Sequence, residues 1–164
     1  MNTGLVIIDV QRGFINEATL HIPDVVFDLQ QEYDHVAVTQ FYNAPGSPWR
    51  KLLEWQRFDR DGDDYPLAFT PREDALLLEK ATYSAMTERL LNWLSAYSIS
   101  EVHLCGIATD ACVLKTALDL FEAEFRPVVL GYACASHGGN DCHSEALHLL
   151  TRQIGQAQVI LQPS

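Results

Sequence analysis

The sequence has no apolar run that approaches the roughly 20 residues needed to cross a bilayer as a helix. It also begins without a basic flank or a cleavage-site pattern, because residues 1–4 lead straight into the apolar residues 5–8. We interpret this beginning as a buried strand rather than as a signal peptide. The expectation is a cytoplasmic protein that does not associate with a membrane.

Cysteine is scarce, and its spacing argues against the usual metal-binding and disulfide frameworks. The four cysteines form no CxxC pair and no zinc-type spacing: Cys105, Cys112, Cys134 and Cys142. Without an export signal, these residues are expected to be free thiols in a reducing cytoplasm.

Positive charge is also scarce. Eleven Lys and Arg residues stand against 22 Asp and Glu residues, which gives a net charge of −11. Nucleic acids and anionic membranes both attract basic surfaces, so neither is expected as a partner. The chain has no internal repeat, and its 164 residues with 48% hydrophobic content are typical of a single globular domain over residues 1–164.

What the chain does contain is a regular alternation of strand-like and helix-like segments. Strands are predicted at 5–10, 36–41, 75–79, 102–107, 128–133 and 159–161. Helices are predicted at 25–33, 49–55, 87–97, 112–123 and 144–154. This alternation predicts an α/β fold with three layers, in which helices cover both faces of a doubly wound, mainly parallel sheet of about six strands. Residues 57–71 are polar and acidic, and we expect a surface loop there, with a substrate lid as one option.

Three reactive side chains lie at the ends of these strands. Asp9 ends the first apolar run, and Lys80 follows the third. Cys112 lies after the fourth, where a helix is expected to begin, so the helix dipole is expected to lower the pKa of its thiol. Sheets of this kind bind ligands at the carboxyl ends of their strands. We therefore expect a base, a cation and a thiol to face one crevice, as nucleophilic catalysis requires.

Each of these residues also has a structural interpretation. A cysteine is more often a buried structural residue than a nucleophile, and an aspartate at a strand end can accept hydrogen bonds from loop amides. A lysine at a strand end can simply mark the edge of the sheet. The combination at neighbouring strand ends favours catalysis, whereas Cys105 and Cys134 fit the structural role better and Cys142 stays unassigned.

The segments around the three residues form recognisable motifs. Residues 5–11 read LVIIDVQ, residues 79–84 read EKATYS and residues 106–113 read GIATDACV. In this order they resemble the first strand, the lysine segment and the nucleophile loop of isochorismatase-like cysteine hydrolases, which include the nicotinamidases. The resemblance covers residues 5–150 and implies that fold, together with a homo-oligomer, either a dimer or a tetramer.

The resemblance also implies roles for individual residues. It implies a catalytic triad of Asp9, Lys80 and Cys112, in which Asp9 takes the thiol proton and Lys80 stabilises charge. It further implies a cis peptide bond between Ile107 and Ala108, and an oxyanion hole formed by the N–H groups of Ala108 and Cys112. The reaction implied is hydrolysis of a C–N bond in a small molecule through a thioester.

One segment departs from the nicotinamidase pattern. Nicotinamidases keep an aspartate and several histidines after the second strand to hold a metal ion, whereas residues 39–45 read TQFYNAP here. The chain then looks closer to the metal-free branch, which implies no metal, no cofactor, and an amide, carbamoyl or ureido substrate in place of nicotinamide. Two alternatives stay open: a catalytically silent binding protein of the same fold, and an isochorismatase-type hydrolase of vinyl ethers, which needs no cysteine.

Aromatic residues near these strand ends are candidates for substrate contacts. We predict substrate-binding roles for Phe14, Phe41 and Tyr83, with Tyr42 and Trp49 as further candidates, although a core position is an equal alternative for each. Residues 136–140 are expected at the rim of the crevice. The alternative for this segment is a flexible turn in which Asn140 or Asp141 caps the helix that follows. His143 is expected to be structural.

Overall fold

The computed structural model describes residues 2–163, and its centre is a sheet of six parallel strands in the order β3-β2-β1-β4-β5-β6. The strands are β1 (Asn2–Ile8), β2 (Val36–Phe41), β3 (Leu76–Lys80), β4 (Ile99–Ile107), β5 (Arg126–Ala135) and β6 (Val159–Ile160). The apolar residues Leu5–Ile8 form a strand because both faces of a parallel sheet are covered, and they are fully buried. The predicted parallel sheet is confirmed.

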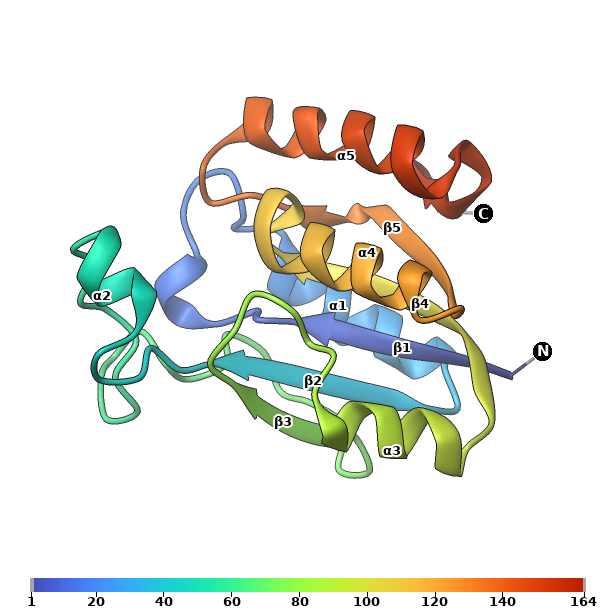
Figure 1. Cartoon of the computed structure of the whole chain (residues 1–164), viewed down its shortest axis with the longest axis horizontal. Helices are drawn as coiled ribbons and strands as arrows, with labels where there is room; N and C mark the ends of the chain where they lie inside the picture. Colours follow the sequence, from blue (N-terminus) through green and yellow to red (C-terminus); the bar gives the residue numbers. More distant parts are fainter. Residues whose placement is uncertain (1, 164) are drawn as a thin grey trace.

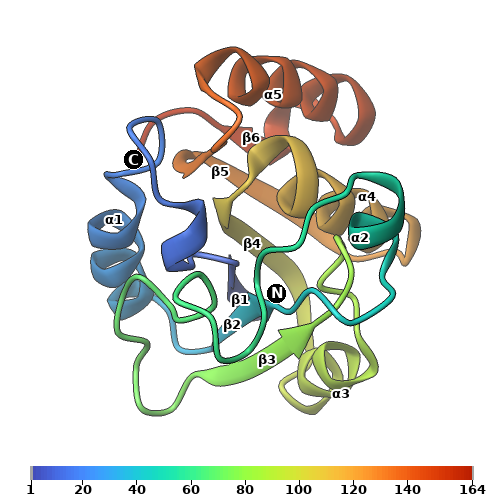
Figure 2. The same cartoon turned by 90° about the vertical axis from the view of Figure 1, so that its left-hand side faces the viewer.

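Helices cover both faces of this sheet (Figures 1 and 2). They are α1 (Ile22–Leu29), α3 (Glu88–Ala96), α4 (Leu114–Glu122) and α5 (Asn140–Ile154). The short helix α2 (Pro48–Leu52) lies beyond the carboxyl ends of the strands (Figure 1). Figure 2 looks along the strands and shows α1 on one face, with α3, α4 and α5 on the other. The chain runs from β1 outward through β2 to β3 and then returns to the other side of β1, where β4, β5 and β6 follow. The connections after β1 and β4 therefore run in opposite directions, and a crevice forms at the carboxyl ends of these two strands. The predicted three-layer, doubly wound fold is confirmed.

The predicted elements differ from the observed ones mainly at their ends. β5 extends to Ala135, and α5 begins at Asn140 rather than at residue 144. The predicted cap of α5 is wrong: Gly139 is the N-cap residue, and no side chain caps this helix. The chain enters α5 through a φ of 110° at Gly139, a conformation that glycine adopts easily. Asn140 and Asp141 therefore lie inside the first turn instead of before it.

The segment 57–71 is a loop, as predicted, but it is anchored to the body of the protein. Its Phe58 side chain is buried in the core. The N–H of Arg12 donates to the carbonyl of Pro66 at 2.8 Å, and Gln30 Nε2 donates to the carbonyl of Thr70 at 3.0 Å. The loop thus packs beside α1, and the lid interpretation receives no support from these contacts.

Gly106 allows β1 and β4 to approach each other where the candidate site begins. Its φ is 113°, and a Cβ atom at this position would lie 2.2 Å from the carbonyl oxygen of Ile8. Gly106→Ala is therefore expected to combine backbone strain with a steric clash and to lower the free energy of unfolding by about 3 kcal/mol. Urea denaturation measures this loss.

Gly139→Ala is the matched control for Gly106→Ala. Gly139 has a similar φ of 110°, but a Cβ atom there would have nothing within 4 Å. It should therefore show only the backbone strain of a conformation that favours glycine, with φ 110° and ψ 174°, and a smaller loss than Gly106→Ala. Equal losses in the two variants would contradict the close approach of the strands.

Candidate active site

Asp9 directly follows β1 and is held by a side chain of β2. Its φ of 46° lies in the left-handed region, which aspartate tolerates better than most residues. Thr39 Oγ1 donates to Asp9 Oδ1 at 2.6 Å and accepts the Asp9 N–H at 3.2 Å. This pair of hydrogen bonds fixes the carboxylate and directs its second oxygen toward β3.

Lys80 is the last residue of β3, and its ammonium group meets that second oxygen. Lys80 Nζ donates to Asp9 Oδ2 at 2.7 Å, and neither side chain is exposed. The carbonyls of Thr82 and Tyr83 accept further hydrogen bonds from Nζ at 2.7 and 3.2 Å. Burial alone would lower the pKa of Lys80, but the charge of Asp9 and the contact with Cys112 raise it above its ordinary value. Lys80 therefore stays a cation.

Cys112 lies in a π-helical turn, Thr109–Val113, that joins β4 to α4. Its Sγ is 3.5 Å from Lys80 Nζ. The turn forms because the N–H groups of Ala111 and Val113 both donate to the carbonyl of Ala108, each at 3.1 Å. The side chain of Cys112 is 7% exposed, so the sulfur is close to the surface of a cavity without being open to bulk water.

Side chains from beyond β5 hold this turn in place. Thr109 Oγ1 lies 2.7 Å from His143 Nδ1, and Ser136 Oγ donates to Asp110 Oδ1 at 2.6 Å. The contact with Thr109 agrees with the structural role that we expected for His143. The nucleophile turn is thus held at Thr109 and at Asp110.

The peptide bond between Ile107 and Ala108 is cis, as the resemblance implied. Ala108 borders the same cavity as Cys112. The structure brings Asp9, Lys80, Ala108 and Cys112 together, while their roles in catalysis stay predictions.

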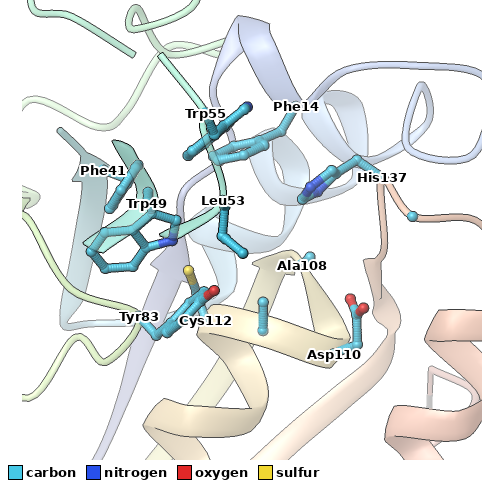
Figure 3. Close-up of a pocket in the computed structure, with 12 residues that line it drawn as sticks. Phe14, Phe41, Trp49, Leu53, Trp55, Tyr83, Ala108, Asp110, Cys112 and His137 are labelled. Carbon is cyan, nitrogen blue, oxygen red and sulfur yellow. The ribbon is translucent and has the colours of Figure 1, made fainter. Parts of the chain in front are cut away.

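The cavity beside Cys112 has a volume of about 340 Å³ (Figure 3). Five side chains form what we call the aromatic wall: Phe14, Phe41, Trp49, Trp55 and Tyr83. The centroid of the Trp49 ring lies 5.0 Å from the ring centroid of Phe41 and 5.0 Å from that of Tyr83. Figure 3 shows Asp110 and His137 on the side of the cavity away from Trp49 and Tyr83.

A family comparison agrees with this geometry. A model of the isochorismatase domain matches residues 3–161. This chain belongs to the isochorismatase family. An uncharacterized isochorismatase family protein, PncA of Bacillus subtilis, is 42% identical over 83 residues, which cover 50% of this chain and 44% of that protein. The ureidoacrylate amidohydrolase RutB of Pseudomonas syringae is 29% identical over 161 residues, which cover 89% of this chain and 64% of RutB.

A solved structure of the family also aligns over nearly the whole chain. The crystal structure of nicotinamidase PncA from Bacillus subtilis has a TM-score of 0.84 at 25% identity, and the match covers 98% of this chain and 100% of that one. The curated relatives, by contrast, are longer proteins, of which this chain spans less than two thirds. The comparisons therefore establish the isochorismatase fold and family.

Most aromatic candidates border the cavity beside Cys112, while their roles in substrate binding stay predictions. Phe14, Phe41, Tyr83 and Trp49 all border the cavity, as predicted. Tyr42 does not border it, because the guanidinium of Arg60 stacks on its ring at 3.9 Å outside the cavity. The prediction for Tyr42 is wrong.

Several neighbours of the site were not predicted. They are Thr39, Leu53, Trp55 and Asp110. Thr39 could have been predicted from the sequence, because it is a hydroxyl residue inside the apolar run 36–41. A buried hydroxyl group needs a hydrogen-bond partner. His137 and Gly138 border the cavity, which confirms the predicted position of residues 136–140 at its rim.

The residues after β2 do not fit a metal site of the kind that nicotinamidases hold there. Within residues 2–163, no three His, Cys, Asp or Glu side chains cluster closely enough to hold a metal ion. The Asn43 amide is already engaged, because its Oδ1 accepts from Ser47 Oγ at 2.5 Å and its Nδ2 donates to the carbonyls of Trp55 and Arg57. That the reaction uses neither a metal ion nor a cofactor stays a prediction.

The predicted lowering of the Cys112 pKa is wrong. Burial raises the pKa of the thiol, the charge of Asp9 raises it further, and Lys80 opposes both only in part. The sulfur also lies inside the π turn rather than at the first residue of the helix. The thiol is therefore protonated at neutral pH, and it needs a base in order to act.

The charges around Cys112 predict opposite shifts in two variants. Asp9→Asn removes the charge that raises the thiol pKa, so the pKa of Cys112 is expected to fall. Lys80→Met removes the charge that lowers it, so the pKa is expected to rise further. The pH dependence of iodoacetamide alkylation at Cys112, followed by mass spectrometry, measures both shifts.

Thr39→Val is the control for these shifts, since it removes a hydrogen bond to Asp9 without removing a charge. It should move the thiol pKa less than either charged-residue variant. A higher thiol pKa in Asp9→Asn than in the wild type would show that the assumed arrangement of charges is wrong.

Proposed function

We propose that this protein is a hydrolase that uses the thiol of Cys112 to cleave a C–N bond of amide, carbamoyl or ureido type in a small molecule. The observation that carries the proposal is the buried chain of contacts from Asp9 to Lys80 Nζ, at 2.7 Å, and from Nζ to Cys112 Sγ, at 3.5 Å, beside an open cavity. The names of the relatives, a nicotinamidase and a ureidoacrylate amidohydrolase, both describe cleavage of such bonds.

The first half of the proposed reaction forms a thioester. Asp9 accepts the proton of Cys112 while the sulfur attacks the carbonyl carbon of the substrate. The raised pKa of the thiol makes this transfer a necessary part of the attack. The tetrahedral intermediate then collapses, the C–N bond breaks, and the nitrogen leaves as ammonia or an amine with the proton from Asp9.

The second half releases the acid. A water molecule attacks the thioester carbon as Asp9 takes one of its protons, and the C–S bond breaks to regenerate the thiol. In both halves, the N–H groups of Ala108 and Cys112 donate to the oxygen on which negative charge develops, a contribution of about 2.7–4 kcal/mol per donor in a comparable site. Lys80 stays charged throughout and balances the charge that moves between Asp9 and the sulfur.

Release of ammonia from a panel of small amides, ureas and carbamoyl acids tests this function. We expect at least one compound to be hydrolysed, and we expect a quenched reaction to show the acyl group on Cys112 by peptide mass mapping. Turnover without any adduct at Cys112, and with full activity after Cys112 is alkylated, would contradict the mechanism.

A binding protein without catalytic activity is the second candidate. The specific observation in its favour is the raised pKa of Cys112, because many catalytic cysteines have a depressed one. The paired Asp9 and Lys80 argue against it, since burying two charges is costly when they have no task. A compound that binds in the cavity and is never hydrolysed would support this second candidate.

We propose further that the protein is a cytoplasmic homo-oligomer, either a dimer or a tetramer, and that it binds neither nucleic acid nor membranes. Its four free cysteines fit a reducing compartment, and its net charge of −11 disfavours anionic partners. Within residues 2–163, no helix is both long and apolar enough to span a membrane. Leu52 and Leu53 next to the cavity are 80% and 63% exposed, as contact residues of an oligomer are in a single subunit. Light scattering after gel filtration measures the oligomeric state.

A further inference from the structure

The cavity beside Cys112 holds one charged group that the proposed chemistry does not use. Asp110 is exposed and borders the cavity. Its Oδ1 accepts from Ser136 Oγ at 2.6 Å, and within residues 2–163 its carboxylate forms no ion pair. The carboxylate also interacts with the thiol of Cys142. Its negative charge borders the space beside the nucleophile.

The cavity offers no cation to balance this charge. None of its lining residues is a lysine or an arginine. Three cations of neighbouring segments each form an ion pair with another carboxylate: Lys80 with Asp9, Arg57 with Asp64, and Lys115 with Asp119. His137 also borders the cavity, but burial lowers the pKa of its imidazole, and the opposing charge of Asp110 does not restore the pKa to its ordinary value.

The opposite side of the cavity suits flat apolar groups and cations. Trp49 and Tyr83 lie there and pack edge to face with each other (Figure 3), and aromatic rings attract organic cations as well as planar apolar groups. The acidic group on one side and the aromatic rings on the other both favour cationic or uncharged groups over anions.

We propose that Asp110 is a specificity-determining residue that selects amides whose remaining part is cationic or uncharged, and that it rejects amides and ureido compounds that carry a carboxylate. This inference rests on the proposed function and narrows its substrate class. Substrates without a carboxylate are favoured, and substrates with one are disfavoured.

Alkylation of Cys112 tests this charge selection without requiring any turnover. Iodoacetamide is neutral, and iodoacetate is an anion of nearly the same size that reacts by the same displacement. The rate of each at Cys112 is measured by peptide mass mapping and divided by its rate with a free cysteine peptide. The ratio of the two normalised rates then reports how strongly the cavity disfavours a carboxylate.

We expect the wild type to favour iodoacetamide by about tenfold or more, and Asp110→Asn to reduce this preference at least about threefold. Asn keeps the acceptor for Ser136 Oγ, so the turn should be preserved. Glu122→Gln, at the exposed end of α4, is the matched control with the same change in charge and should keep the wild-type ratio. A ratio that Asp110→Asn leaves unchanged, or that Glu122→Gln changes equally, would overturn the proposal.

Three related amides extend the test to catalysis: 4-(aminomethyl)benzamide, 4-methylbenzamide and 4-carbamoylbenzoate. The first two are expected to show a kcat/KM about tenfold or more above that of the third, and Asp110→Asn should narrow this gap mainly through KM. Equal or better hydrolysis of the carboxylate compound would overturn the inference. If none of the three is hydrolysed, the result counts against the proposed function, and the alkylation ratio still decides the role of Asp110.

Discussion

Cys112→Ala is expected to lower kcat on the best amide substrate by at least about 1,000-fold while the variant folds like the wild type. The loss is large because the sulfur forms the bond to the substrate carbon, and alanine offers no nucleophile in its place. The fold should survive, because Lys80 keeps its contacts with Asp9, Thr82 and Tyr83. Ammonia release measures activity, and urea denaturation should show a loss of stability below about 1.5 kcal/mol.

Cys142→Ala is the matched control for this loss. Cys142 is a second partly accessible thiol, and its Sγ lies 3.6 Å from the carbonyl of Gly138 at the rim of the same cavity. It has no contact with Lys80, so its removal should leave kcat within about a factor of three. If Cys112→Ala kept more than a tenth of the wild-type activity, the thiol would not be the nucleophile.

The convergence of the three charged and reactive groups was predictable because it follows from a rule about sheets. Apolar runs locate β1, β3 and β4, and parallel strands place their carboxyl ends at one edge. Asp9, Lys80 and Cys112 each lie at or just beyond such an end. Their approach therefore needed only the periodicity of the sequence and the handedness of the crossovers, with no knowledge of side-chain packing.

The aromatic wall was only partly predictable, because it depends on the irregular chain between β2 and β3. Trp55 borders the cavity since its own carbonyl is held by Asn43 Nδ2 at 3.0 Å, and Ser47 holds the other end of that amide. Hydrogen bonds of this kind have no periodic signature in a sequence. A rule that locates strands and helices gives no information about where such a segment runs.

The pKa of Cys112 was mispredicted for a different reason. The argument from a helix N-terminus considers one favourable interaction of the thiolate and omits its desolvation. In the folded protein, burial and the charge of Asp9 outweigh the opposing charge of Lys80. Both dominant effects arise from tertiary contacts, so neither could be weighed before the fold was known.

The buried pair of Asp9 and Lys80 predicts a strongly non-additive effect on stability. Asp9→Asn and Lys80→Met are each expected to lower the free energy of unfolding by about 3–5 kcal/mol, because each leaves a buried charge without its partner. Asparagine tolerates the φ of 46° at position 9 and can still accept from Thr39 Oγ1, so the loss in that variant is mainly electrostatic. Urea denaturation at pH 7 measures each loss.

The double variant Asp9→Asn/Lys80→Met should lose less than the sum of the single losses by at least about 2 kcal/mol, since it contains no unpaired buried charge. Lys115→Met is the control: its ion pair with Asp119 is partly exposed and should contribute less than about 1 kcal/mol. Additive losses in the double variant would mean that the two charges do not interact as the structure indicates. A double variant that is nearly as stable as the wild type but inactive would show that the pair is kept for its chemistry, because folding alone would not require it.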